Sequence, residues 1–205
     1  MDVVCSMIDC FTTHYLDEQH TLLVGALPLK LQLSAYQFQD LWNLHPDAFD
    51  EIMMYGRPVK TPRWQQAFGA DYHFSGQTST ALPVPLLLRP LLEWSQSTID
   101  SRLNGLFLNW YDGSLGHYIG KHRDSVVNMV EGAPIVTVSF GETRTLRLRP
   151  HKGRGFTDFD AKAASVFVIP YETNHAFSHE VPVSKKATGL RVSVTIRAFK
   201  QSQTC

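Results

Sequence analysis

The chain has 205 residues and a mass of 23.2 kDa, which suits one ordinary domain with a substantial core. Its 19 basic residues balance 19 acidic ones and the pI is near 7.1, so a global field that would hold it on nucleic acid or an anionic membrane is excluded. The three cysteines lack the paired spacing of a disulfide framework or a zinc site, which favours a reducing compartment. The first twenty residues contain no Lys or Arg, and no apolar run approaches the length of a membrane span. We therefore expect an intracellular protein, cytoplasmic or nuclear, without membrane attachment.

Two helices are predicted before the midpoint of the chain. Residues 34–37 have the form of a capping box and open a short helix that carries Phe38 and Leu41. Residues 84–99 form a second helical candidate, in which Pro90 must delay the start or introduce a kink. From Gly105 onward the apolar period changes to two, and this predicts strands at 105–111, 134–140, 143–149, 165–169 and 190–199. The second half is thus predicted to be β structure.

The last of these strands has one polar, cationic face and one apolar face. Arg191, Ser193, Thr195 and Arg197 alternate with valine and isoleucine. A polar strand face need not meet solvent, because a small barrel can hold a ligand inside. The pattern suggests a barrel interior lined for a ligand.

His122-Arg123-Asp124 places an imidazole and a carboxylate two residues apart, on one face of an extended strand. A second histidine from a distant strand, His179, can complete a set of two imidazoles and one carboxylate. Such a set is the facial triad of non-haem Fe(II) oxygenases, which leaves open positions for a co-substrate and O2. His175 is the main rival ligand, and by itself a His-x-Asp tripeptide is often no more than a surface feature.

A facial-triad enzyme that uses 2-oxoglutarate must also hold a dicarboxylate, whose far carboxylate needs a buried cation, best supplied by a guanidinium. Arg191 lies twelve residues after His179 on the polar strand face. Asn109 and Tyr111 share a face of an earlier strand and can donate hydrogen bonds to the same acid. The alternative for the arginines is an exposed strand edge with solvated charges.

Four segments together resemble the AlkB family of Fe(II)- and 2-oxoglutarate-dependent dioxygenases. These are Asn109-Trp110-Tyr111-Asp112-Gly113, Tyr118-Ile119-Gly120-Lys121-His122-Arg123-Asp124, Ala133-Pro134-Ile135-Val136-Thr137-Val138-Ser139-Phe140-Gly141 and Arg191-Val192-Ser193-Val194-Thr195-Ile196-Arg197. The four segments occur in the same order as in the family. The resemblance extends from about Tyr55 to Phe199. It implies an α+β fold with a double-stranded β-helix (jelly-roll) core, N-terminal helices and a substrate-lid extension.

The resemblance also implies the roles of individual residues. His122, Asp124 and His179 are then the iron ligands, and His179 is preferred to His175 because residues 177–182 resemble the family's ligand-bearing segment. The residues implied to hold 2-oxoglutarate are Asn109, Tyr111, Arg191, Arg197 and Ser193. The cofactors are Fe(II), 2-oxoglutarate as co-substrate and O2. The implied reaction hydroxylates a methyl carbon on a base nitrogen, and the product collapses to release formaldehyde, while 2-oxoglutarate becomes succinate.

Upstream of the barrel, residues 62–76 resemble the substrate lid of the duplex-DNA repair branch. Tyr72 and Phe74 stand where that branch lines its base pocket, Arg63 begins the segment, and Tyr55 resembles the intercalating finger. A flipped base needs flat apolar partners to replace its lost stacking. Alternatively, Tyr72 and Phe74 are core aromatics of a strand and Tyr55 is a turn residue. Where the branch tends to have an acidic residue after the iron-binding Asp, this chain has Ser125-Val126.

Two basic clusters could contact a nucleic acid backbone despite the zero net charge. Phosphate contacts lend salt-sensitive affinity that does not depend on sequence. The first cluster consists of Arg144, Arg147, Arg149, Lys152 and Arg154, and the second of Lys185 and Lys186. The alternative for the first cluster is a solvated hairpin tip.

The sequence therefore predicts oxidative dealkylation of N-alkylated nucleic acid bases, as in DNA repair. Alternatives are a 2-oxoglutarate-dependent oxygenase acting on RNA, protein or a small molecule, and a non-catalytic module that binds nucleic acid. We expect a monomer whose partner is DNA with alkylated bases. We also expect one domain over residues 1–205, with helices and a nucleotide-recognition lid in 1–100 and the jelly-roll catalytic core in 101–200.

Overall fold

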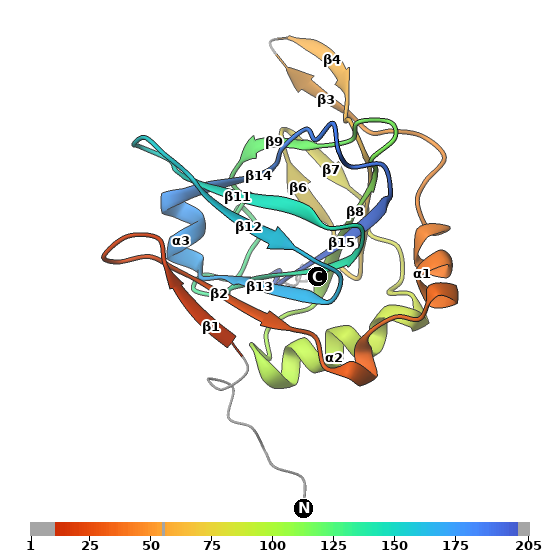
Figure 1. The fold of residues 1–205 in the computed structure, drawn as a ribbon, viewed down its shortest axis with the longest axis horizontal. Helices are drawn as coiled ribbons and strands as arrows, with labels where there is room; N and C mark the ends of the chain where they lie inside the picture. The colour runs from red at the N-terminus through yellow and green to blue at the C-terminus, as the bar shows by residue number, and fades with distance from the viewer. Residues whose placement is uncertain (1–10, 55, 201–205) are drawn as a thin grey trace, which may run out of the picture.

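The structure, a computed structural model, describes residues 11–54 and 56–200, and its core consists of two larger antiparallel sheets (Figure 1). Residues of both sheets line one cavity. The larger sheet has the strand order β1 (Phe11–Tyr15), β2 (Thr21–Ala26), β13 (Ser165–Ile169), β10 (Ile135–Gly141), β15 (Leu190–Arg197), β8 (Gly105–Asp112) and β5 (Trp64–Phe68). The smaller sheet has the order β12 (Thr157–Ala161), β11 (Arg144–Pro150), β14 (Phe177–Val181) and β9 (Ile119–His122). This is the predicted jelly-roll core.

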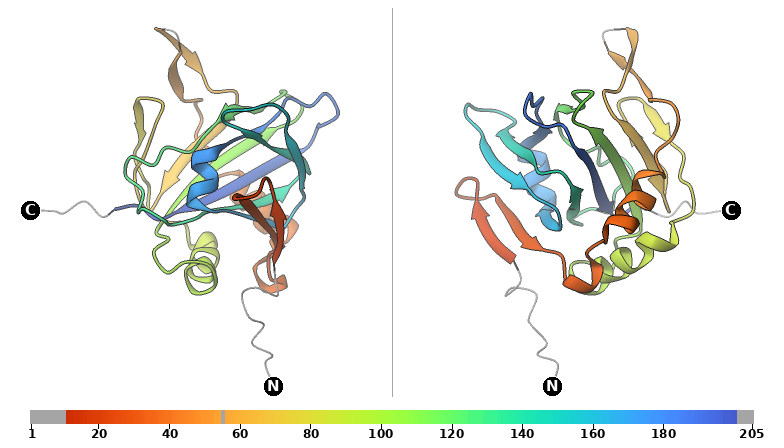
Figure 2. Two further views of the ribbon diagram at one scale, coloured as in Figure 1. Left: turned by 90° about the vertical axis from the view of Figure 1, so that its left-hand side faces the viewer. Right: turned by 45° about the vertical axis from the view of Figure 1, so that its right-hand side comes forward.

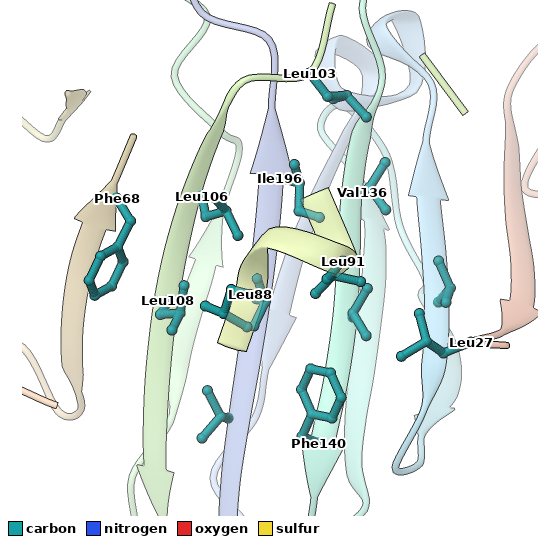
Figure 3. Packing of buried hydrophobic residues seen from close by; sticks show 14 of the residues in the cluster. Leu27, Phe68, Leu88, Leu91, Leu103, Leu106, Leu108, Val136, Phe140 and Ile196 are labelled. Atoms are coloured by element: carbon teal, nitrogen blue, oxygen red, sulfur yellow. The ribbon is translucent and has the colours of Figure 1, made fainter. Parts of the chain in front are cut away.

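Alternation along the central strands separates a core face from a cavity face. On the core face, Leu106 and Leu108 of β8 and Ile196 of β15 pack with Leu88 and Leu91, and this layer is drawn in Figure 3. The odd-numbered residues of β8 and β15 point the other way and line the cavity together with residues of β9, β11 and β14. The polar face of the last strand is therefore interior, as its sequence predicts.

Two helices cover the outer face of the larger sheet (Figures 1 and 2). α1 (Ala35–Trp42) begins at the predicted capping box, in which Ser34 Oγ accepts from the Gln37 backbone N–H and Gln37 Oε1 accepts from the Ser34 N–H. Trp110 Nε1 of β8 donates to the Leu41 carbonyl at 2.9 Å and ties α1 to the sheet. A 3-10 turn, η3 (Leu86–Leu88), precedes α2 (Arg89–Thr98), so Pro90 lies in the first turn, where its missing N–H costs little.

The remaining elements are short and lie around the cavity or connect the sheets. They are η2 (Leu29–Leu31), β3 (Glu51–Met54), β4 (Arg57–Lys60), β6 (Tyr72–Phe74), β7 (Gln77–Ser79) and α3 (Tyr171–Ala176). The β3–β4 hairpin projects from the rest of the molecule in every view (Figures 1 and 2). Ile52, Met53, Val59 and Lys60 of this hairpin line the cavity. Within the described residues, no helix is long and apolar enough to cross a membrane.

The expectation of helices in the first hundred residues is incomplete. Strands β1 and β2 also lie there, and β2 pairs with β13, so the start of the described chain extends the larger sheet. The apolar periodicity of these strands is weak because their side chains are mostly half-exposed or exposed. The predicted strands of the second half are confirmed to within two residues at either end.

A candidate iron and 2-oxoglutarate site

His122, Asp124 and His179 meet at one point of the cavity wall. His122 ends β9 and lies directly opposite His179 of β14, with their ring centroids 4.3 Å apart. Asp124 follows two residues after β9 ends, and its Oδ1 lies 3.8 Å from His122 Nε2 and 3.9 Å from His179 Nε2. One ligand atom from each of the three lies within 4.8 Å of the others. The donor set and its convergence fit a metal with two imidazole ligands and one carboxylate ligand.

The two imidazoles are prepared to act as neutral ligands. His122 Nδ1 lies 2.9 Å from the Gly120 carbonyl and donates to it, which leaves Nε2 unprotonated and directed toward Asp124. Burial, and then the neighbouring His179, lower the pKa of His122 to about 3. Burial also lowers the pKa of His179. The rival His175 lies in α3, packs edge-on against Tyr171 and has no part in the group.

Asp124 is kept ionised by a buried arginine. Arg197 donates from Nε at 3.1 Å and from Nη2 at 2.7 Å to Asp124 Oδ2, and both side chains are 3% exposed. Burial acts to raise the pKa of Asp124, but Arg197 and the two imidazoles outweigh it and hold that pKa below its ordinary value. Tyr72 donates to the other oxygen at 3.3 Å. The predicted 2-oxoglutarate ligand Arg197 therefore also orients the carboxylate of the triad.

The backbone of Asp124 is held by Asn174, a residue that no sequence pattern singled out. The Asp124 N–H donates to Asn174 Oδ1 at 3.0 Å, and Asn174 Nδ2 donates to the Asp124 carbonyl at 3.1 Å. Asn174 is 2% exposed and stands in α3, fifty residues away in sequence. This reciprocal pair replaces the ladder bonds that end with β9, and it fixes the segment that carries the carboxylate.

Arg191 presents an unsatisfied buried guanidinium to the same cavity. Its Nη2 donates to Ser139 Oγ at 2.9 Å, while Nε and Nη1 are buried without a partner among the described residues. The Tyr111 ring lies 5.0 Å from the guanidinium carbon. Burial lowers the pKa of Arg191. These unpaired N–H donors of a buried cation match a carboxylate ligand, so the site fits the far end of 2-oxoglutarate.

Asn109 and Ser193 lie opposite each other on β8 and β15, and both line the cavity. The Asn109 Oδ1 accepts from Arg63 Nε at 2.7 Å, which directs its amide nitrogen elsewhere as a donor. Arg63 Nη2 donates to Gln65 Oε1, and Gln65 Nε2 donates to Asp50 Oδ2. Arg63 is therefore part of a buried polar chain, and not an exposed lid residue.

Tyr72 and Phe74 form a flat aromatic surface next to the metal ligands. Their rings stack with centroids 5.3 Å apart at an interplanar angle of 22°, and both line the cavity, whose volume is about 520 Å³. His122 and Arg63 line the same space. The predicted finger, Tyr55, lies outside the described residues.

The basic clusters divide into paired and free charges. Arg147 forms an ion pair with Asp158 at 2.6 Å, and Arg149 forms one with Glu180 at 2.7 Å. Arg144 is 4% exposed and donates to the carbonyls of His117 and Pro182. It therefore stabilises the fold and does not face a nucleic acid backbone. The remaining basic residues of the two clusters, Lys152, Arg154, Lys185 and Lys186, are exposed and lie outside these ion pairs.

Ser139 is a further residue of the site that was not predicted from the sequence. It could have been found, because Thr137 and Ser139 are alternating polar residues in an otherwise apolar strand. Asn174 had no such signal, since a helical asparagine is ordinarily a surface residue.

Comparisons with known proteins agree with this geometry. A family model described as the 2OG-Fe(II) oxygenase superfamily matches residues 42–197. Proteins named DNA oxidative demethylase ALKBH2 align with 73% of this chain, at 29% identity for the human protein and 30% for the mouse protein. The aligned part spans 61% of the human protein and 67% of the mouse protein, so the chain covers about three fifths of the length of the human relative.

Solved structures confirm the fold. OsALKBH1 superposes with a TM-score of 0.57 at 14% identity, over 91% of this chain and 99% of the other. An oxidoreductase of the 2OG-Fe(II) oxygenase family from Burkholderia pseudomallei gives 0.55 at 14% identity, over 89% and 88% of the two chains. The family description names 2-oxoglutarate and Fe(II), the two groups that the cavity fits, and an oxygenase uses O2. The chain therefore belongs to the 2OG-Fe(II) oxygenase superfamily and, within it, to the AlkB family.

Proposed function

We propose that this protein is a dioxygenase that oxidatively removes alkyl groups from the nitrogens of nucleic acid bases, with DNA preferred to RNA. The observation that carries the proposal is the presence, in one cavity, of the triad, the unpaired Arg191 donors and the stacked Tyr72–Phe74 pair. The relatives named DNA oxidative demethylase support DNA as the substrate. For a methyl group, the resulting products are the demethylated base, formaldehyde, succinate and CO2.

In this proposal the chain's own residues bind and orient the reactants. His122, Asp124 and His179 hold Fe(II), which, once 2-oxoglutarate is bound, supplies the activation of O2 that oxidises the alkyl carbon. Arg191 holds the far carboxylate of 2-oxoglutarate, with Ser139 fixing the guanidinium plane. Arg197 Nη1 is buried and unpaired among the described residues and is available to the near carboxylate.

Further contacts to 2-oxoglutarate come from the polar face of the larger sheet. Tyr111, Asn109 and Ser193 lie on the cavity face beside Arg191. A hydroxyl or amide donor at each position adds a neutral hydrogen bond to a site whose charge comes from arginine. The apolar core on the other face of the same strands keeps these groups in place and water out.

Tyr72 and Phe74 are proposed to stack on the extruded base, with His122 opposite them. A flat aromatic surface compensates the stacking that the base loses when it leaves the helix. Tyr55, which falls between β3 and β4 in the sequence, remains the predicted finger that fills the gap in the duplex. Lys152, Arg154, Lys185 and Lys186 are the exposed cations proposed to contact phosphates, and Arg147 and Arg149 would do so from within their ion pairs.

We further propose that residues 1–205 act as one domain and one monomer. The pairing of β2 with β13 supports a single unit, because it joins the first part of the chain to the catalytic sheet. A DNA substrate is consistent with a nuclear or cytoplasmic location, which stays a prediction.

The test is turnover of a methylated oligonucleotide. Protein, Fe(II), ascorbate and 2-oxoglutarate are incubated with single- and double-stranded DNA and with RNA of the same sequence, and loss of the lesion is followed together with succinate and formaldehyde. We expect equal amounts of repaired base, formaldehyde and lesion-dependent succinate. Asp124→Ala should abolish all three, because it removes a metal ligand.

Succinate formed only with another class of substrate would refute the proposal in favour of a different oxygenase. Tight binding of the oligonucleotide without succinate would refute catalysis itself. The matched control is Asp158→Ala, which removes an exposed carboxylate that pairs with Arg147 and lies outside the cavity. It should leave turnover of a saturating substrate unchanged.

A further inference from the structure

The described wall of the cavity is poor in negative charge. Its cationic lining residues are Lys60, Arg63, Lys121, Arg123, Arg191 and Arg197. Among the described lining residues, Asp124 is the one carboxylate, and it is both a triad member and the partner of Arg197. No carboxylate of the described wall therefore remains to meet a positively charged base.

The bound reactants do not change this balance. The two negative charges of 2-oxoglutarate and the one of Asp124 face the two positive charges of Fe(II) and one each from Arg191 and Arg197, so one positive charge is left over. Arg63 then adds a positive charge that no carboxylate contacts within the described residues, because its hydrogen-bond partners are the neutral amides of Asn109 and Gln65. Asp50, whose charge acts on Arg63, is bonded to Gln65 and does not line the cavity.

The loop that follows the triad carboxylate also lacks an acid. Ser125 lines the cavity, and its backbone N–H donates to the Tyr72 hydroxyl at 3.3 Å. Val126 turns away and packs in the apolar cluster that includes Tyr72. The wall next to the aromatic pair thus offers a hydroxyl and a hydrocarbon at the places where a carboxylate could have stood.

Alkylated bases fall into two charge classes. A methyl group on N3 of cytosine or N1 of adenine adds to a nitrogen that carried no proton, so the ring is cationic at neutral pH. A methyl group on N3 of thymine or N1 of guanine replaces a proton, so the ring stays neutral and keeps its carbonyl beside the alkylated nitrogen. A cation that enters a cavity of low dielectric without a counter-charge loses its hydration uncompensated.

We infer that this site selects uncharged alkylated bases, such as N3-methylthymine and N1-methylguanine, over cationic ones such as N3-methylcytosine and N1-methyladenine, which carry an exocyclic amine where the uncharged bases have the C4 or C6 carbonyl. The inference rests on the proposed function and names its substrate class. Arg63 is assigned as a specificity-determining residue. Its Nη1 makes no hydrogen bond within the described residues, and a guanidinium N–H can donate to the C4 carbonyl of a thymine but not to the exocyclic amine at C4 of a cytosine.

The test compares two oligonucleotides that differ in one lesion, N3-methylthymine or N3-methylcytosine. The two rings have the same size and the same methyl position, and they differ in charge and in the carbonyl at C4. With Fe(II) and saturating 2-oxoglutarate, we expect kcat/KM for repair to favour the thymine lesion at least tenfold. This comparison uses the unaltered protein and depends on no variant.

Two substitutions at Ser125 then separate charge from size. Ser125→Glu places a carboxylate in the wall and should lower the thymine-to-cytosine ratio of kcat/KM at least tenfold. Ser125→Gln has the same shape without the charge and should keep the ratio of the unaltered protein. A change in 2-oxoglutarate affinity cancels from the ratio, because both oligonucleotides are repaired by the same loaded protein.

A third variant, Arg63→Gln, tests the donor. It should lower kcat/KM for the thymine lesion more than for the cytosine lesion, so that the ratio again falls. Removal of the hydrogen bond from Arg63 to Asn109 affects both lesions alike and does not enter the ratio.

The outcomes distinguish this inference from the function on which it rests. Repair of both lesions at equal rates, or faster repair of the cytosine lesion, would overturn the charge selection and leave dealkylation intact. Repair of neither lesion, nor of the corresponding purines, would overturn the proposed function and this inference with it. Preference for the thymine lesion that survives in Ser125→Glu would overturn the assignment to charge.

Discussion

Arg191 gives the most specific prediction, because the protein alone satisfies only one of its three guanidinium nitrogens. Its side chain is 2% exposed and has two nitrogens, Nε and Nη1, with no partner among the described residues. Buried donors without partners cost stability, so the arrangement is useful only if a ligand satisfies them. We predict that Arg191→Lys and Arg191→Met weaken 2-oxoglutarate binding, and that neither destabilises the ligand-free protein as the truncation of a buried side chain ordinarily would.

The magnitudes follow from the hydrogen bonds. A hydrogen bond to a charged group contributes about 1.5–3 kcal/mol, and each 1.4 kcal/mol is about tenfold in affinity. Arg191→Lys keeps the charge but loses the fixed arrangement of N–H donors, so one such bond is removed and the affinity should fall about 10- to 100-fold. Arg191→Met removes both bonds and the charge, so the affinity should fall about 100-fold or more.

Stability should respond in the opposite sense. Without ligand, Arg191→Met removes a buried charge with unsatisfied donors, together with one hydrogen bond to Ser139 Oγ. Replacing such a group by an apolar side chain of similar length is often neutral or stabilising. The Tm of the ligand-free variant should therefore equal or exceed that of the unaltered protein. Added 2-oxoglutarate should raise the Tm of the unaltered protein and leave that of the variant unchanged.

Calorimetric titration with 2-oxoglutarate under anaerobic conditions, with Mn(II) in place of Fe(II), measures the affinity, and thermal unfolding with and without 2-oxoglutarate measures the stability. The control is Arg102→Lys, because Arg102 forms an exposed ion pair with Asp100 outside the cavity. An Arg191→Lys protein that binds 2-oxoglutarate as tightly as the unaltered one would refute the reasoning. So would a ligand-free Arg191→Met protein that unfolds several degrees earlier.

Three further predictions concern the support of the site, the surface and the fold. Asn174→Ala leaves the buried backbone N–H and carbonyl of Asp124 unpaired, so the affinity for Mn(II) should fall about 10- to 100-fold in a metal titration. An unchanged affinity would show that Asn174 does not position the metal ligand Asp124. Replacing both Lys152 and Arg154 by alanine should weaken DNA binding and lower its salt dependence, by about one unit of slope for each phosphate that is no longer neutralised, while 2-oxoglutarate affinity stays the same. Gly141→Ala should cost about 2–4 kcal/mol in denaturant unfolding, because Gly141 has φ +82° and a Cβ there would strike the Leu190 carbonyl oxygen; a decrease under about 1 kcal/mol would contradict this.

The capping box, the late start of α2 and five strands of the second half, β8, β10, β11, β13 and β15, are readable from the sequence. Each depends on contacts within a few residues or on the alternation that a pleated strand imposes. The weakly patterned β1 and β2 are not predicted, because half-exposed side chains on both faces leave no clear period.

The chemical types at the site are also readable. His122 and Asp124 are separated by one residue, and Arg191 and Arg197 share a strand face, so the side to which each pair points follows from local geometry. The choice of His179 over His175 comes from resemblance, and the structure brings His179 opposite His122 across the β9–β14 ladder. The spacing of residues in the sequence does not predict this choice, because it depends on the pairing of β14 with β9.

The sequence by itself determined the His122-x-Asp124 pair, the arginines on one face of the last strand and the alternation that turns polar groups inward, because these depend on the period of the chain. Only the tertiary structure decided which donors remain unpaired and what holds the others. Asn174 reaches Asp124 over fifty residues, and Arg63 reaches Asn109 over 46. Such contacts are fixed by the packing of sheets and helices against one another, and no local pattern encodes a hydrogen bond that forms only when distant segments meet.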